Sequence, residues 1–268
     1  MNQQERREYL IQRLLAERED YKNRMMPETE KEQWILLRSL LNVREPKAAD
    51  QDFLRVQDEY LQVEIEKKGI TDLAALRPVR ENIYLWQGDI TTLRADAIVN
   101  AANSQMLGCF APCHLCIDNA IHTFAGVQLR LACARLMKLL RNKYGMNYQQ
   151  PTAVPMLTDA YNLPAKKVIH IVGPIVGGEL TAEHEKELAD CYQNTLAMCA
   201  ENRLKTVAFC CISTGVFMFP NKRAAEIAVS TVSKWLAESP GQIDKVIFNV
   251  FKDEDREIYS GILNSDGE

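Results

Sequence analysis

Two patterns of hydrophobic residues follow one another along the chain. Up to about residue 80, apolar residues recur at every third or fourth position, which is the period of an amphipathic α-helix. Residues that commonly end helices interrupt this pattern at Pro27, Pro46 and Gly69. The sequence therefore predicts three helices, around residues 9–15, 28–43 and 50–68.

After residue 80, short runs of consecutive apolar residues alternate with longer amphipathic stretches. The runs predict strands at residues 83–86, 97–99, 154–157, 168–172, 207–212 and 246–251. The stretches predict helices at residues 117–140, 182–201, 221–238 and 254–263. Strands without polar alternation are buried on both faces, so we expect a mixed, mostly parallel sheet covered by helices on both sides. This is the α/β class, here a three-layer α/β/α sandwich with an N-terminal helical extension.

The two patterns predict two parts, a helical cap at residues 1–80 and an α/β domain at residues 81–268. Three short helices need a surface to pack against, and we expect them to dock on the α/β domain. The alternative, that they present a surface to a partner protein, stays open, because no chemical motif lies among them.

Composition and charge narrow the function. The 268 residues carry a formal net charge of −4, which disfavours nucleic-acid binding, because attraction to a phosphate backbone needs a basic surface. The N-terminal segment is charged throughout, and it predicts neither a signal peptide nor a membrane anchor. We therefore expect a cytoplasmic protein that contacts no membrane and whose eight cysteines stay reduced.

Asp89 lies in the segment Gly88-Asp89-Ile90, directly after a predicted strand. Ligands of such α/β folds bind beyond the carboxyl ends of the strands. A carboxylate there is suited to accept a hydrogen bond from an exocyclic amine such as that of adenine. The alternative, that Asp89 closes an Asx turn, is the simpler interpretation of this segment taken alone.

The segment Ser213-Thr214-Gly215-Val216-Phe217 follows the strongest apolar run. Gly215 permits a positive φ and a close backbone approach. Successive N–H groups in such a loop form an anion-binding nest that suits a diphosphate, with Phe217 packed on a ribose. In the alternative, this is an ordinary strand-to-helix loop that Phe217 anchors in the core.

Two amides, Asn100 and Asn103, end the strand predicted at residues 97–99. A buried amide needs hydrogen-bond partners, so a pair at a strand end indicates a polar ligand. For Asn100, a bond to a neighbouring loop is the better interpretation. We interpret two histidines, His122 and His170, as structural, since both lie among apolar residues.

Three cysteines and a histidine gather within residues 109–116. Thiolate and imidazole are the usual zinc ligands, and the spacing Cys109-x4-His114-x-Cys116 offers three of them on a loop that Pro112 bends. Three protein ligands leave a fourth position for water or substrate, whereas a structural site closes with four, for which Cys113 is a candidate. Buried thiols, or a nucleophilic thiol activated by the following helix N-terminus, are the alternatives.

Together, five motifs resemble those of macrodomains, the ADP-ribose-binding family, over about residues 82–265. In chain order they are Gln87-Gly-Asp-Ile-Thr91, Asp96-Ala-Ile-Val-Asn-Ala-Ala-Asn103, Asp118-Asn-Ala-Ile-His122, Ile169-His-Ile-Val-Gly-Pro174 and Ile212-Ser-Thr-Gly-Val-Phe217. The resemblance implies that Asp89 holds the adenine amine and that residues 213–217 wrap the diphosphate. It places Asn103 and Asp118 near the distal ribose, with Ile90 and Asn119 also among the substrate-binding positions.

The run Gly108-Cys-Phe-Ala-Pro-Cys-His-Leu-Cys116 stands where ordinary macrodomains carry glycines. It resembles the motif of a zinc-dependent subclass, which also has an N-terminal helical extension. The resemblance implies one Zn2+ per chain, held by Cys109, His114 and Cys116. The position of Cys113 is variable in that motif, so Cys113 is left out of the ligand set.

The resemblance implies a hydrolase that removes mono-ADP-ribose from modified proteins, with Asn103 and Asp118 as the catalytic residues. Two alternatives stay open. One is a reader that binds ADP-ribose without turnover, and the other is a hydrolase of a small derivative such as O-acetyl-ADP-ribose. A lipoyl-carrier protein and an ADP-ribosylating sirtuin are partners that the resemblance alone implies.

Overall fold

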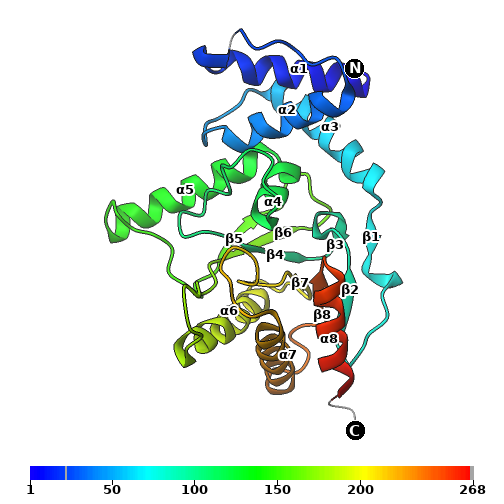
Figure 1. Cartoon of the computed structure of the whole chain (residues 1–268), viewed down its shortest axis with the longest axis vertical. Coiled ribbons are helices and arrows are strands. Elements are labelled where there is room, and N and C mark those ends of the chain that lie inside the picture. The colour runs from blue at the N-terminus through cyan, green and yellow to red at the C-terminus, as the bar shows by residue number, and fades with distance from the viewer. Residues whose placement is uncertain (22, 266–268) are drawn as a thin grey trace. The chain divides into compact units, whose positions relative to one another are not determined.

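The computed structural model describes residues 1–21 and 23–265, which form two compact units (Figure 1). The first unit comprises Met1–Gly69, Leu107–Tyr148 and Ala160–Leu163. The second comprises Ile70–Met106, Gln149–Asp159 and the chain from Pro164 onward. The N-terminal helices are thus compact together with a stretch of the predicted α/β domain, and the division at residue 80 stays a prediction.

The second unit contains the main sheet. Its strands are β2 (Ile83–Gln87), β4 (Ala97–Ala101), β5 (Met156–Asp159), β6 (Lys167–Ile171), β7 (Thr206–Phe209) and β8 (Lys245–Val250). They lie in the order β2-β8-β7-β4-β6-β5, and every neighbouring pair is parallel except β5 and β6. The predicted α/β class and mostly parallel sheet are confirmed.

Helices α6 (Ala182–Glu201), α7 (Asn221–Glu238) and α8 (Asp253–Ser265) flank this sheet (Figure 1). They pack in sequence, α6 on α7 and α7 on α8. Aromatic pairs join helices to strands, since Tyr192 of α6 lies 4.9 Å from Phe209 of β7 between ring centroids, and Tyr259 of α8 lies 5.1 Å from Phe248 of β8. The apolar runs of the sequence are therefore buried strands with helices against them.

A polar chain crosses the sheet at His170, which is fully buried in β6. Its Nδ1 lies 3.1 Å from Nδ2 of Asn100 in β4, and its Nε2 lies 3.0 Å from Oγ1 of Thr158 in β5. Asn100 thus bonds to a neighbouring strand rather than to a neighbouring loop as we expected. Because Asn100 and His170 are paired residues in the β4–β6 register, the ladder itself brings them together.

The sequence did not predict a small parallel pair formed by β1 (Thr71–Asp72) and β3 (Leu93–Arg94). Each strand has two residues, which is too short for a periodic pattern. Two 3-10 turns, η2 (Leu73–Ala75) and η3 (Ile90–Thr92), lie beside these strands in the sequence.

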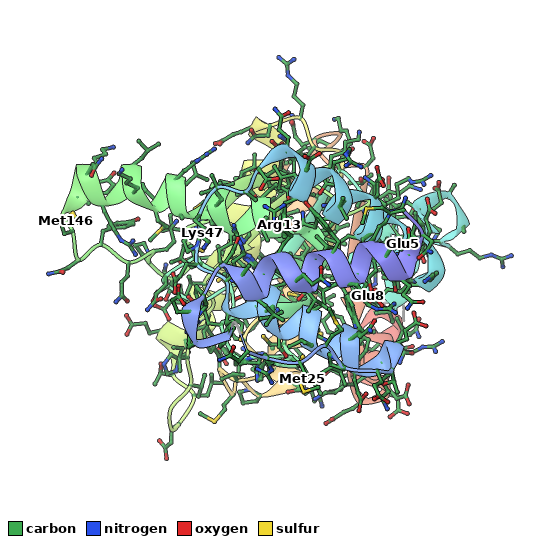
Figure 2. All side chains as sticks on the ribbon, turned by 90° about the horizontal axis from the view of Figure 1, so that it is seen from above. Glu5, Glu8, Arg13, Met25, Lys47 and Met146 are labelled. Carbon is green, nitrogen blue, oxygen red and sulfur yellow. The ribbon has the colours of Figure 1, made fainter. Side chains whose placement is uncertain are left out.

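The first unit is helical. Its helices are α1 (Gln3–Ala16), η1 (Glu19–Tyr21), α2 (Glu30–Val43), α3 (Gln51–Lys68), α4 (Ile117–Ala125) and α5 (Val127–Tyr144). Figure 2 shows α1 from above, with Glu5, Glu8 and Arg13 along its length. The apolar faces of α1, α2 and α3 form one core with Val127 of α5. None of the helices that the structure describes combines the length and the apolar character that crossing a membrane requires.

The helix predicted over residues 117–140 is in fact two helices, α4 and α5, which Gly126 separates. Gly126 has a φ of 92°, a conformation that side chains disfavour. A Cβ built there would lie 2.6 Å from Nε2 of Gln57 on α3. The Oε1 atom of Gln57 accepts a hydrogen bond of 2.9 Å from the N–H of Val127, the first residue of α5. The break is therefore fixed by a side chain that lies far away in the sequence.

Candidate active site

Three predicted segments meet at one edge of the sheet. Strands β2, β4 and β7 run parallel, so the residues after their carboxyl ends share that edge, where ligands of α/β folds bind. Asp89 follows β2, Asn103 follows β4 and Ser213 follows β7. One strand, β8, separates β2 from β7, which places their ends about 10 Å apart at the usual strand spacing. This is a span suited to an extended ligand.

Asp89 precedes η3 and caps it. Its Oδ1 accepts hydrogen bonds from N–H of Thr91 at 2.9 Å and from Oγ1 of Thr91 at 2.6 Å. The turn-closing role that we held open for Asp89 is therefore present. These two bonds hold the carboxylate in one orientation, and the adjacent Ile90 is buried. Contact with an adenine amine stays a prediction.

The backbone of the loop after β7 is left-handed at Ser213, with a φ of 66°, and at Met218, with a φ of 56°, rather than at Gly215. The N–H of Phe219 donates to the carbonyl of Ser213 at 3.0 Å, and that of Met218 donates to the carbonyl of Gly215 at 3.0 Å. A Cβ built at Gly215 meets no atom of the described chain within 4 Å. The glycine therefore leaves its backbone open to a ligand instead of supplying an unusual φ.

Ser213 lies against Gly173 of the segment after β6. A Cβ built at Gly173 would be 2.1 Å from Oγ of Ser213, so only glycine fits there. Ser213 is buried, and its Oγ has no hydrogen-bond partner among the described residues. An unsatisfied buried hydroxyl costs about 1–3 kcal/mol, which leaves this atom available to a ligand, and the contact itself stays a prediction.

Phe217 is half-buried, and its carbonyl accepts a hydrogen bond of 2.9 Å from the N–H of Val176. The core anchor of this loop is Phe219, which is 1% exposed. The alternative that Phe217 anchors the loop in the core is therefore wrong, because Phe219 has that role. Val216 and Met218 are exposed beside it.

Asn103 closes a turn after β4. Its Oδ1 accepts a hydrogen bond of 3.0 Å from the N–H of Gln105, and its carbonyl accepts one of 2.9 Å from the N–H of Met106. This turn orients the side chain at the ligand-binding edge of the sheet. Its predicted catalytic role stays a prediction.

Within the first unit, the predicted metal ligands come together. The ligand atoms of Cys109, His114 and Cys116 lie within 4.8 Å of one another, and Sγ of Cys109 is 3.7 Å from Nδ1 of His114. Tetrahedral zinc with ordinary Zn–S and Zn–N bonds separates such atoms by about 3.6 Å. Two sulfurs and one imidazole nitrogen fit zinc in chemistry, and the separation of Cys109 and His114 matches this spacing.

The loop between these ligands contains a tight turn at Pro112 and Cys113, closed by a hydrogen bond of 3.2 Å from the N–H of His114 to the carbonyl of Ala111. The φ of Cys113 is 54°, and a proline followed by a residue with positive φ is typical of a type II turn, in which the second position is usually glycine. The left-handed conformation costs a cysteine about 1–2 kcal/mol.

The thiol of Cys113 is directed to α2 rather than to the other ligands. Its Sγ lies 3.3 Å from Oγ of Ser39 and 3.5 Å from the carbonyl oxygen of Ile35. Among the described residues, the cluster of ligand atoms contains Cys109, His114 and Cys116 and does not include Cys113. The geometry therefore favours three protein ligands.

Cys116 is the N-cap of α4, and its Sγ accepts a hydrogen bond of 3.4 Å from the N–H of Asn119. Burial raises the pKa of the Cys116 thiol to about 12, against the smaller lowering effect of that N–H. A nucleophilic thiol needs a lowered pKa, whereas burial acts in the opposite direction at Cys116. A bound cation would stabilise the thiolate.

Asp118 and His122 face each other one turn apart on α4. Both are buried, and Oδ1 of Asp118 lies 3.5 Å from Nε2 of His122. A Cβ on Gly108 would be 2.8 Å from the His122 ring, so the glycine lets the loop of residues 108–116, here called the ligand loop, pass directly over that ring. The i, i+4 spacing in the sequence predicts that Asp118 and His122 share a helix face, which the structure confirms, although we interpreted His122 as structural.

Arg130 of α5 is a buried residue of this region that sequence reasoning missed. Its guanidinium donates to the carbonyl of Leu107 at 2.7 Å, and to three carbonyls at the end of α2, those of Leu41, Asn42 and Arg44. It also lies 4.3 Å from the ring centroid of Phe110. Burial lowers the pKa of Arg130. No motif marks this arginine, because its partners are backbone atoms.

Known proteins are similar to this chain in both sequence and fold. A Macro domain model matches residues 99–228. A protein from Treponema medium named "Protein-ADP-ribose hydrolase" is 51% identical over 268 residues, covering 98% of this chain and 100% of that protein. The chain belongs to the Macro domain family. A second protein of the same name, from Staphylococcus aureus (strain Mu50), is 45% identical over 265 residues, covering 98% of this chain and 97% of that protein.

Among solved Macro domains, that of Trypanosoma brucei in complex with ADP-ribose superposes with a TM-score of 0.64. It is 27% identical and covers 89% of this chain and 97% of that chain. The Macro domain match includes Asn103, the ligand loop, Asp118 and residues 213–217, whereas Asp89 and the N-terminal helices lie outside it. The two relatives match over 98% of this chain, so their similarity extends into those helices.

Proposed function

We propose that this Macro domain protein is a zinc-dependent hydrolase that releases mono-ADP-ribose from modified proteins in the cytoplasm. The observation that carries the proposal is the cluster of Cys109, His114 and Cys116 in the loop between Asn103 and Asp118. The names of two relatives, which cover this chain almost completely, support the reaction. Zinc is supported by the donor atoms alone.

For binding, we propose that the sheet edge holds ADP-ribose. The carboxylate of Asp89, oriented by its turn, would accept the adenine amine, and Ile90 would line that end. The open backbone at Gly215 and the buried hydroxyl of Ser213 would contact the diphosphate, with Thr214, Val216 and Phe217 around it. The ADP-ribose complex of the similar Trypanosoma brucei macrodomain supports ADP-ribose as the ligand, while the roles of the individual residues rest on the resemblance.

For the reaction, we propose that water replaces the modified side chain at the anomeric carbon of the distal ribose. The bond from that carbon to the side chain breaks, ADP-ribose takes the hydroxyl, and the side chain takes the remaining proton. Asp118 would position the water and accept its proton, and the Asn103 amide would orient the ribose. Asn119 is assigned to the same end of the substrate. When bound at Cys109, His114 and Cys116, zinc supplies a Lewis acid.

The resemblance also underlies our proposal for partners, a lipoyl-carrier protein as the modified substrate and an ADP-ribosylating sirtuin that modifies it. This part of the proposal rests on no residue contact. An assay with the modified and unmodified carrier protein tests it separately from the reaction itself.

The test of the reaction is release of ADP-ribose from a mono-ADP-ribosylated protein. Wild type is expected to release it, and Asp118→Asn is expected to lose activity by about 10²- to 10⁴-fold, the usual contribution of a general base. Asp52→Asn, at an exposed position of α3, makes the same chemical change and serves as the matched control. Tight binding of ADP-ribose without release in wild type would identify a reader instead. Preference for O-acetyl-ADP-ribose in competition would identify a small-molecule hydrolase.

A further inference from the structure

The N-terminal helices contact the ligand loop directly, within one compact unit. Helix α2 presents three polar residues to it, Arg38, Ser39 and Asn42, which share one face of the helix because they lie one turn apart. Asn42 is buried and Arg38 is half-buried.

Asn42 holds the strained turn. Its Oδ1 accepts a hydrogen bond of 2.9 Å from the N–H of Cys113, the residue with positive φ. Its Nδ2 donates to Oγ1 of Thr123 on α4 at 2.9 Å. One buried amide thus ties α2 both to the turn and to the helix that follows the ligands.

Arg38 holds the chain on the C-terminal side of that turn. Its Nη2 donates to the carbonyl of His114 at 3.0 Å and to Oδ1 of Asn119 at 2.9 Å, while its Nε lies 3.3 Å from the same Oδ1. Asn119 in turn donates from Nδ2 to the carbonyl of Ala111 at 3.0 Å and from its backbone N–H to Sγ of Cys116 at 3.4 Å. The guanidinium is therefore hydrogen-bonded directly to one predicted ligand, His114. It is linked to a second, Cys116, through Asn119.

We infer that Arg38 is a positioning residue for the metal ligands and that α2, with Asn42, preorganises the zinc-binding loop. The bonds fix the backbone of His114 and the side chain of Asn119, which itself contacts Cys116, so two of the three predicted ligands are held in place before metal binds. Loops that must be ordered by the ligand bind it more weakly, since the ordering entropy is lost on binding. The N-terminal helices are thereby part of the metal site, although they supply none of its ligands.

This inference rests on the proposed zinc site, and its test uses zinc affinity rather than turnover. Purified full-length protein, stripped of metal, is titrated with zinc against a chromophoric chelator of known affinity. The expected result is that Arg38→Ala weakens zinc binding by about tenfold or more, as loss of an outer-shell partner usually does. The zinc affinity of Arg38→Lys is expected to lie between those of wild type and Arg38→Ala, because lysine keeps the charge but lacks the planar fork that reaches both acceptors.

Arg55→Ala is the matched control, since Arg55 lies exposed on α3 and the substitution removes the same charge. The melting temperature of each metal-free variant is measured beside the titration, and Co2+ added in place of zinc reports the ligand geometry through its visible spectrum. A purely structural role predicts a lower metal-free melting temperature with unchanged zinc affinity and an unchanged Co2+ spectrum.

Zinc affinity of both Arg38 variants within twofold of wild type would overturn the inference while leaving the zinc site intact. If Arg38→Ala does not fold, the Arg38→Lys titration decides alone. Failure of wild type to bind zinc would overturn the proposed metal site as well, so the two failures are distinguishable.

Discussion

Replacing Cys113 separates the strain of the loop turn from metal ligation. Cys113 has a φ of 54°, which costs a residue with a side chain about 1–2 kcal/mol relative to glycine. Cys113→Gly removes this cost, but glycine loses about 0.5–1 kcal/mol more conformational freedom on folding. The thiol contacts to Ser39 and Ile35 are also lost. The free energy of unfolding of Cys113→Gly is therefore expected to stay within about 1 kcal/mol of wild type.

Cys113→Val is expected to destabilise the protein at the same position. A β-branched residue is a true outlier at positive φ, so this variant is expected to lose about 2 kcal/mol of stability. For a chain of this size, each kcal/mol shifts the melting temperature by about 2–4 °C, which thermal unfolding resolves. The hydrogen bond from the N–H of Cys113 to Asn42 is available to either variant, so the comparison isolates the turn.

Zinc content of Cys113→Gly, compared with that of Cys109→Ala, addresses ligation. Because the thiol of Cys113 is directed to α2, Cys113→Gly is expected to retain one zinc per chain, whereas Cys109→Ala is expected to lose it. Equal loss of zinc in Cys113→Gly and Cys109→Ala would show that Cys113 is a fourth ligand, and would refute the geometric reasoning for an open coordination position.

Two further predictions concern the second unit. Gly173→Ala is expected to weaken ADP-ribose binding by about tenfold or more, measured by calorimetry, because the new Cβ would lie 2.1 Å from Oγ of Ser213 and displace residues 213–217. Unchanged affinity would contradict the proposed contact of these residues with the diphosphate. For His170, burial lowers the pKa to about 3, so the unfolded chain binds a proton below about pH 6.5 that the folded protein excludes, and stability falls as the pH drops from 6.5 toward 3. His170→Gln is expected to lose less stability than wild type over that interval in urea titrations, and an equal loss would show that other groups govern acid unfolding.

The sheet and its ligand-binding edge were predictable from the sequence because they depend on local patterns. Apolar runs define buried strands, and the polar residues after them, Asp89, Asn103 and Ser213, reach one edge as a consequence of parallel strands. The spacing of Cys109, His114 and Cys116 lies within a single loop, so their approach needs no long-range information. In both cases, patterns within each segment are enough to specify its geometry.

What was not predictable depends on contacts between distant segments. The helix break at Gly126 is fixed by Gln57, and the turn at Cys113 by Asn42. Neither partner stands out in the sequence, because a glutamine or asparagine on a helix is usually a surface residue. In the loop of residues 213–217 the positive φ falls on Ser213 rather than Gly215, and Ser213 lies against Gly173, which is distant in the sequence. Such effects follow from packing and leave no periodic signal.

The measurement that tests the central claim most directly is zinc content together with ADP-ribose release, before and after chelation. Wild type is expected to contain one zinc per chain, to lose turnover with the metal and to regain it when zinc is restored. Cys109→Ala, His114→Ala and Cys116→Ala are expected to lack both metal and turnover, while melting temperatures distinguish lost chemistry from lost folding. Full turnover by metal-free wild type, or by all three variants, would contradict the account.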